Sequence, residues 1–124
     1  MIPDGYTILP QGKLAAAVTY LEITDFAPAP VPAAPEGFTL ERILQPPLGW
    51  YRDLFRAVGS PWLWFGRLTL SDAELAVTLH DAAVEVYVLR QEGQDVGLLE
   101  LDARVPGEME LAYLGLVPAA IGRG

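Results

Sequence analysis

Cysteine is absent from this chain of 124 residues, and histidine and lysine occur once each, as His80 and Lys13. The absence of cysteine excludes a disulfide scaffold, a thiolate zinc site and a cysteine nucleophile. Because transition-metal sites in proteins are built largely from histidine and cysteine, we expect no metal cofactor. A chain without disulfides fits a reducing compartment, and we therefore expect a cytoplasmic protein.

Basic residues are also scarce, since 8 lysines and arginines stand against 16 acidic residues and give a net charge of −8. Binding to nucleic acid or to anionic membranes needs a basic face, so we expect neither partner. A membrane-spanning helix needs about 20 apolar residues in succession, and the sequence has no such run. The negative charge slightly favours a cationic or neutral substrate.

The first 37 residues differ in composition from the rest. Residues 14–24 are rich in β-branched and aromatic residues and predict a strand. Residues 25–37 are rich in proline and alanine, which predicts a stiff, polyproline-like spacer. We therefore expect an N-terminal extension over residues 1–37 and one folded domain over residues 38–124.

Hydrophobic periodicity predicts the elements of that domain. Alternation over residues 38–43 indicates a strand, and apolar residues spaced three and four apart from residue 48 onward indicate a helix that ends before Gly59. Ser60 and Pro61 are typical of the start of a new helix, and the aromatic residues 62–65 are expected in the core. Ser71 and Glu74 form a capping box that begins a helix ending near His80.

Residues 84–89, 96–103 and 109–117 predict three further strands joined by short turns, an antiparallel meander. The whole order predicts an α/β (α+β) fold in which a mixed, largely antiparallel sheet is flanked by helices. Glu100 and Asp102, on the middle strand of the three, are an alternative acidic pair for catalysis, but we expect them to form a solvated face. His80 is expected to cap its helix at the surface.

The last strand leads into Gly122-Arg123-Gly124. A strand that enters a Gly-x-Gly turn can present successive backbone N–H groups to phosphate oxygens. The stretch from Leu114 through Pro118 to Gly124, together with the order of elements, resembles the GNAT superfamily of N-acetyltransferases. The resemblance covers residues 38–124 and implies the N-terminal part of the acyltransferase fold. A second glycine or alanine of the loop is expected at position 126, beyond the sequence, and Ile121 stands where the family has Gln or Arg.

The resemblance implies acetyl-CoA as co-substrate and gives residues to hold it. The backbones of Leu114 and Leu116 are expected to pair with the pantetheine arm and the thioester carbonyl. The amides of Gly122, Arg123 and Gly124 are expected to meet the pyrophosphate. The family's usual general acid is a tyrosine, and none of the five tyrosines of this sequence lies at the corresponding position.

Glu110 is the candidate general base for an incoming amine. Side chains alternate along a strand, so we expect Glu110 to share one face with Leu114 and Leu116, and to gain a raised pKa from partial burial. In some members of the family a glutamate at this position has that role. The alternative is a strand-end glutamate that faces solvent or pairs with an arginine.

These expectations combine into an N-acetyltransferase that transfers acetyl from acetyl-CoA to a primary amine of a small molecule or peptide by direct attack. Arg52, Arg56 and the aromatic region 50–65 are candidates for contacts with the acceptor. The 124 residues alone are expected to be inactive and to self-associate, for example as a homodimer. The alternative is a non-catalytic acidic protein-interaction or CoA-binding module. Ile121 and the incomplete loop, which depart from the family's pattern, are the features that favour it.

Overall fold

The computed structural model describes residues 4–123 and divides the chain into two units, Met1–Pro32 and Ala33–Gly124. Residues 4–32 of the first unit contain no helix and no strand, and their side chains are exposed. The strand predicted over residues 14–24 is therefore wrong. Strand propensity reflects packing against neighbouring strands, and residues 4–32 form no strand with which this segment could pair.

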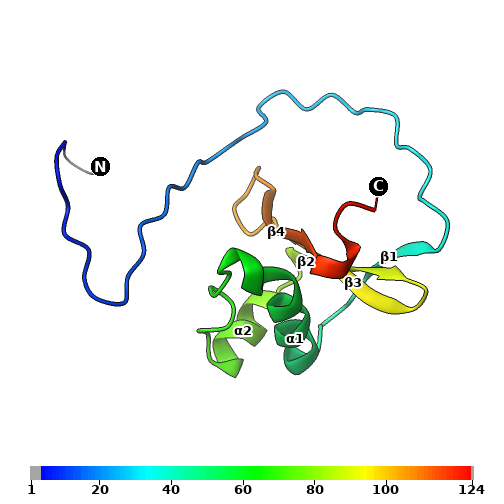
Figure 1. Ribbon diagram of the computed structural model, residues 1–124. Helices are drawn as coiled ribbons and strands as arrows, with labels where there is room; N and C mark the ends of the chain where they lie inside the picture. Colours follow the sequence, from blue (N-terminus) through cyan, green and yellow to red (C-terminus); the bar gives the residue numbers. More distant parts are fainter. Residues whose placement is uncertain (1–3, 124) are drawn as a thin grey trace. The chain divides into compact units, whose positions relative to one another are not determined.

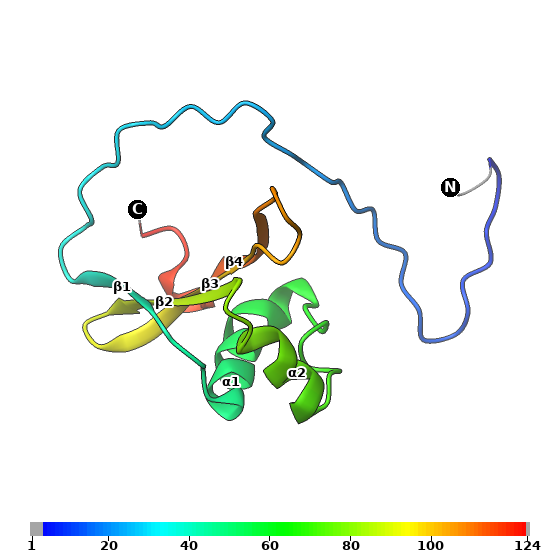
Figure 2. The ribbon, with the colours of Figure 1, turned by 180° about the vertical axis from the view of Figure 1, so that it is seen from behind.

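The second unit is an α/β arrangement of one four-stranded sheet and two α-helices (Figure 1). The strands lie in the order of the sequence and every neighbouring pair is antiparallel, so the predicted meander is confirmed. Views from opposite sides place both helices on one face of the sheet (Figures 1 and 2). The elements are β1 (Phe38–Arg42), α1 (Leu48–Gly59), α2 (Asp72–Leu79), β2 (Val84–Gln91), β3 (Gln94–Asp102) and β4 (Glu110–Leu116).

Helix α1 buries the apolar stripe that its sequence predicted, and Tyr51 and Phe55 are completely buried. The end of the helix differs from expectation. Gly59 is its last residue, and Ser60–Trp62 form a single 3-10 turn instead of a new α-helix. Leu63 has a left-handed backbone with φ 58° and ends that turn. Trp64 then packs directly on Gly59, where a Cβ atom would lie 2.5 Å from the tryptophan side chain.

Helix α2 begins at the predicted capping box. The Glu74 backbone N–H donates to Ser71 Oγ at 3.3 Å, and the Ser71 N–H donates to Glu74 Oε2 at 2.8 Å. These two bonds satisfy backbone donors that the first helical turn leaves free. His80 is the exposed C-cap, and its Nε2 atom lies 3.1 Å from the Pro46 carbonyl oxygen.

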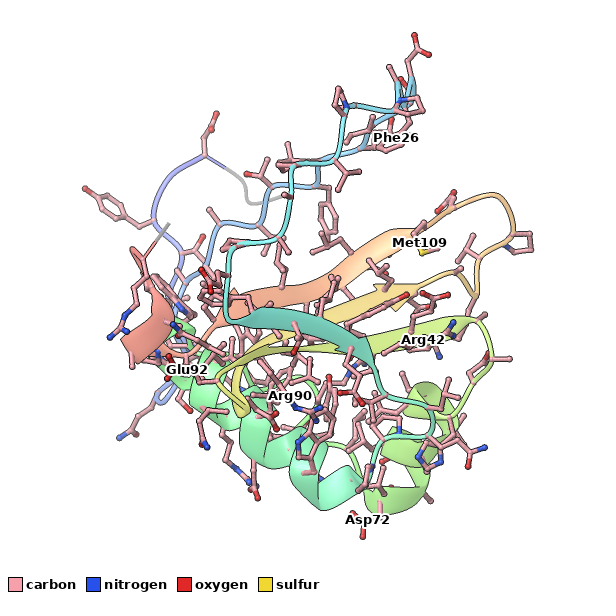
Figure 3. All side chains as sticks on the ribbon, turned by 90° about the vertical axis from the view of Figure 1, so that its right-hand side faces the viewer. Phe26, Arg42, Asp72, Arg90, Glu92 and Met109 are labelled. Carbon is pink, nitrogen blue, oxygen red and sulfur yellow. The ribbon has the colours of Figure 1, made fainter. Side chains whose placement is uncertain are left out.

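The two faces of the sheet have different environments. The inner face, which carries Val86, Val88 and Leu98, packs on the helices and is buried. The outer face carries the alternate residues, among them Leu40 and Leu89, which lie opposite each other on β1 and β2. Figure 3 labels Glu92 at one end of the sheet and Met109 at the other. The core therefore lies between one face of the sheet and the helices.

The turn between β2 and β3 consists of Glu92 and Gly93, since Gln91 pairs with Gln94. Both turn residues have positive φ, 50° and 80°, the geometry of a type I′ hairpin turn. Glycine adopts this conformation freely, whereas a glutamate is strained in it.

We expect Glu92→Asn to stabilise the protein by about 0.5 kcal/mol, because asparagine tolerates positive φ and is favoured in this turn. Glu92→Gln is the matched control, since it removes the same charge without relieving the backbone. Urea unfolding measures both. Equal stabilisation by the two variants would assign the effect to charge and not to the turn.

Candidate functional site

A buried carboxylate lies at the centre of the inner face. Glu100 is 0% exposed and the Asp102 side chain is 10% exposed, so the expectation that they face solvent is wrong. Glu100 occupies the inner-face position of β3 that follows Leu98, and the alternation of the strand brings it under α1 and the connection between the helices. We call Tyr51, Arg67, Glu100 and Tyr113 the Glu100 cluster.

The carboxylate of Glu100 receives hydrogen bonds from two directions. The Tyr51 hydroxyl, on α1, donates to Oε2. Arg67, from the connection between the helices, donates through Nη2 to Oε1 and through Nε to Oε2, the second at 3.5 Å. The cluster therefore joins a helix, a connecting segment and the sheet through one charged group. A buried charge that is paired and hydrogen-bonded avoids most of the cost of burial.

The pKa values of the partners follow from this contact. Burial raises the pKa of Tyr51, and the negative charge of Glu100 and its hydrogen bond raise it further. Burial opposes the charge of Arg67, but its hydrogen bonds to Glu100 and the carboxylate charge together raise its pKa above the ordinary value. Tyr51 therefore remains a neutral donor, and Arg67 remains a cation.

Tyr113 connects the cluster to β4. The Arg67 guanidinium carbon lies 5.2 Å from the centre of the Tyr113 ring, a cation–π contact. The same ring packs edge-on against Phe55 at 4.8 Å and against Trp64 at 5.1 Å between centroids. Burial raises the pKa of Tyr113, and Arg67 opposes that shift. The inner face of β4 is thus fixed by aromatic packing and by one cation.

The aromatic residues 62–65 divide between core and surface. Trp64 packs in the core as expected, whereas Trp62 and Phe65 are 63% and 69% exposed. The expectation that the whole group is buried is therefore wrong. The left-handed residue between Trp62 and Trp64 turns the chain, so neighbouring side chains diverge.

Arg52 and Arg56, the candidates for acceptor contacts, already have partners. Arg52 donates to Asp72 and, at 2.9 Å, to the Leu70 carbonyl oxygen. Arg56 donates to Asp53 one turn earlier on α1, also at 2.9 Å. Arg52 therefore joins α1 to the start of α2, whereas the Arg56 pair lies within α1 at the surface. Contacts from either of them to an acceptor stay a prediction.

A β-bulge in β4 changes where Glu110 points. Tyr113 lies opposite Glu100, but Leu111 lies opposite Leu101, so Ala112 is an extra residue in the register. Glu110 consequently lies opposite Asp102, and opposed residues have side chains on the same face. The expectation that Glu110 shares a face with Leu114 and Leu116 is wrong, because the bulge reverses the alternation.

Glu110 is exposed, so the partial burial expected for it is not found. It lines a hollow of about 290 Å³ with Asp102, Arg104, Val105 and Glu108. Asp102 accepts hydrogen bonds from Arg104 Nε at 3.0 Å and from Nη2 at 2.6 Å, and this contact lowers the pKa of Asp102. Within this hollow Arg104 therefore neutralises Asp102, and Glu108 and Glu110 supply negative charge.

The residues expected to hold acetyl-CoA lie at the other end of β4. Leu114 and Leu116 belong to the outer face, opposite Leu99 and Gly97. After Leu116 the chain makes a 3-10 turn, Pro118–Ala120, and Gly122 adopts positive φ of 76°. Leu116 and Arg123 line one hollow of about 280 Å³ together with apolar side chains. Gly124 lies outside the described residues.

β4 is an edge strand of the sheet, so one side of its backbone carries no partner strand in the described part of the chain. Its main-chain N–H and C=O groups on that side are available for an extended ligand. The structure thus brings Leu114, Leu116 and Arg123 to one end of an open edge. It does not bring Glu110 to the same face.

Sequence reasoning missed the Glu100 cluster, although a signal for it exists. Every second residue of a strand lies on the same face, and this spacing links Val96, Leu98 and Glu100. A carboxylate in such an apolar series needs a buried donor. Arg67, which lies outside the regular elements, carries no pattern that would have paired it with Glu100.

Two further properties concern the described residues as a set. None of the helices in residues 4–123 has the length and apolarity that crossing a membrane requires. Over the same residues, no group of three or more histidine or acidic side chains is arranged to hold a metal ion.

Removing Arg67 should reveal the cost of burying Glu100. We expect Arg67→Met to lower the free energy of unfolding by about 3–5 kcal/mol, because it leaves a buried charge without its counterion. The double variant Arg67→Met/Glu100→Gln should lose less than the sum of the single variants, with a coupling of about 1–3 kcal/mol.

The control is Arg56→Met, which removes a surface pair and should cost no more than about 0.5 kcal/mol. Urea unfolding of the wild type and of the four variants, Arg67→Met, Glu100→Gln, the double variant and Arg56→Met, measures these values. Additive single-variant losses, or equal losses at Arg56 and Arg67, would contradict the role given to the cluster.

Comparison with protein-family models, with curated proteins and with solved structures gives no match. The arrangement of the sheet, the Glu100 cluster and the end of β4 therefore has to be interpreted from the residues of this chain. What the resemblance to the acetyltransferases implies for cofactor, acceptor and catalysis is a proposal.

Proposed function

We propose that this domain is the N-terminal part of a GNAT-like N-acetyltransferase, which transfers acetyl from acetyl-CoA to a primary amine. One observation carries the proposal: an open edge strand, β4, leads into a glycine turn after a β-α-α-β-β-β series. That order and that turn agree with what the resemblance implies. The absence of cysteine from the sequence supports a cytoplasmic setting.

In this proposal acetyl-CoA lies along β4 as an additional strand would. Main-chain groups beside Leu114 and Leu116 bind the pantetheine arm and the thioester carbonyl, so apolar side chains at these positions are compatible with the role. Gly122 has positive φ and open space at its Cα, which lets a pyrophosphate approach the amides of Gly122 and Arg123. The cationic side chain of Arg123 favours an anion at the same place.

The chemistry assigned to the site is direct attack. The nitrogen of a neutral amine forms a bond to the thioester carbonyl carbon, the C–S bond breaks with its electron pair on sulfur, and the proton that the nitrogen loses on becoming an amide is taken up by the CoA thiolate. Glu110 would remove the proton that the amine carries in water. The thioester would lie at the open edge of β4. This edge is accessible from both faces of the sheet, so the Glu110 carboxylate, on the inner-face side, can reach an amine that arrives at the thioester.

The acceptor in this proposal is a small-molecule or peptide amine, and a cationic one is favoured. Glu108 and Glu110 border the hollow at the start of β4, where Asp102 is paired with Arg104. A protonated amine would be attracted to this negative region before it loses its proton.

The cofactor role is tested by titrating acetyl-CoA into the chain in a calorimeter. We expect binding in the wild type and a loss of at least about tenfold, or 1.4 kcal/mol, in Gly122→Val. A branched side chain there is strained by the positive φ and obstructs the amides that receive the pyrophosphate.

Gly107→Val is the matched control, because Gly107 has nearly the same φ, 83°, and equally open surroundings in the turn before β4. It should bind acetyl-CoA like the wild type. Absence of heat with the wild type would favour a non-catalytic interaction module instead. Equal binding by both valine variants would remove the glycine turn from the site.

The role of Glu110 is tested by release of the CoA thiol in an active protein that contains these 124 residues. We expect Glu110→Gln to lower kcat/KM by about 10²-fold or more, the range of general base catalysis, and to remove the dependence on alkaline pH. Glu92→Gln, which removes the same charge from the exposed turn between β2 and β3, should leave kcat/KM nearly unchanged. An unaltered pH profile in Glu110→Gln would show that another group is the base.

A further inference from the structure

The outer face of the sheet is apolar and has no second layer within residues 33–123. Both helices lie on the inner face (Figures 1 and 2). Leu40 on β1 and Leu114 on β4 are 59% and 58% exposed. The register places further leucines between them on the same face, Leu89, Leu99, Leu101 and Leu116. A contiguous apolar surface of this kind marks an interaction site on a protein that is otherwise polar outside.

Few charges lie on this face in a chain whose net charge is −8, and Arg123, which lines the hollow at its border, is cationic. The charged strand residues that project from it are Arg42 and Glu85, which form an ion pair at 3.2 Å. The Tyr87 hydroxyl donates to the same glutamate at 2.6 Å. Two copies of a strongly acidic molecule repel each other through most of their surface. The outer face is where that repulsion is smallest and where apolar contact is greatest.

The shape of the face also suits a second sheet. Gly97, on the outer face of β3, has no side chain, and a Cβ atom there would lie 2.9 Å from Leu116 and 3.1 Å from Leu89. The side chains around this point border the hollow of about 280 Å³, which Phe38 and Leu40 also line. Apolar side chains from an opposing sheet could therefore pack into the hollow beside Gly97.

The size of the face reaches what a specific dimer needs. With strands about 4.8 Å apart and a rise of about 3.3 Å per residue, a four-stranded face of this length covers roughly 500 Å². Two such faces bury roughly 1,000 Å², the lower end for a specific interface. Packed sheets lie about 10 Å apart and cross at about 30°, a geometry that two apolar sheet faces can adopt.

We propose that the outer faces of two copies of this chain pack against each other and form a homodimer with a central two-layer sandwich of sheets. The helices of each copy lie on the outside. The contact is twofold and isologous, so it closes at two copies. The dimer does not depend on the proposed acetyltransferase activity, and the test contains no acetyl-CoA, so either proposal can fail without the other.

The test is analytical ultracentrifugation of the 124-residue chain and of Leu40→Glu, which places a charge within the contact, on the β1 side of the face. We expect the wild type to sediment at twice the chain mass of 13.5 kDa. Leu40→Glu should have a dissociation constant raised by at least about tenfold, with an unchanged circular dichroism spectrum. The control, Val77→Glu, adds the same charge at a residue of α2 that is 73% exposed, and should dimerise like the wild type.

If Leu40→Glu does not fold, Leu40→Thr decides the question, because threonine is well tolerated in strands and shortens the apolar contact. A weaker dimer in that variant supports the proposal, and an unchanged dimer overturns it. A monomeric wild type at the highest soluble concentration, whatever covers the face, also overturns it. So does a series of species larger than a dimer, which an isologous contact cannot produce.

Discussion

The hydrogen-bonded ion pair between Glu100 and Arg67 fixes the position of β4. A buried carboxylate on β3 requires donors, and the two nearest come from α1, through Tyr51, and from the connection between the helices. Arg67 can reach Glu100 only if that connection lies across the sheet, and in doing so it stacks on Tyr113. The inner face of β4 is therefore held by the helical layer, while its outer edge remains open.

An edge strand fixed in this way is suited to bind an extended ligand. Its main-chain groups are already ordered, so a ligand that pairs with them does not have to order the strand. The bulge at Ala112 directs the side chains at the two ends of β4 to different faces of the sheet. Glu110 is turned toward the inner-face side, and Leu114 and Leu116 are turned outward. The open edge of β4 is thus bordered by Glu110 on the inner-face side and by apolar side chains on the outer face.

Local signals predicted most of the folded domain. The capping box at Ser71, the apolar stripe of α1 and the alternation of β2 each depend on neighbouring residues, and each was confirmed. The features that failed depend on distant ones. The bulge in β4 is a property of pairing with β3, the burial of Glu100 depends on Arg67, and the expected strand over residues 14–24 has no partner strand. For the candidate site, the glycine turn was visible in the sequence and the Glu100 cluster was not.

Amide hydrogen exchange with and without acetyl-CoA tests most directly whether the open edge of β4 is a ligand site. The sheet provides an internal control, because β1 is its other edge. The account predicts that acetyl-CoA slows exchange in residues 114–123 and leaves β1 unchanged. Exchange that is unaltered throughout the chain, or slowed equally in β1 and β4, would contradict it.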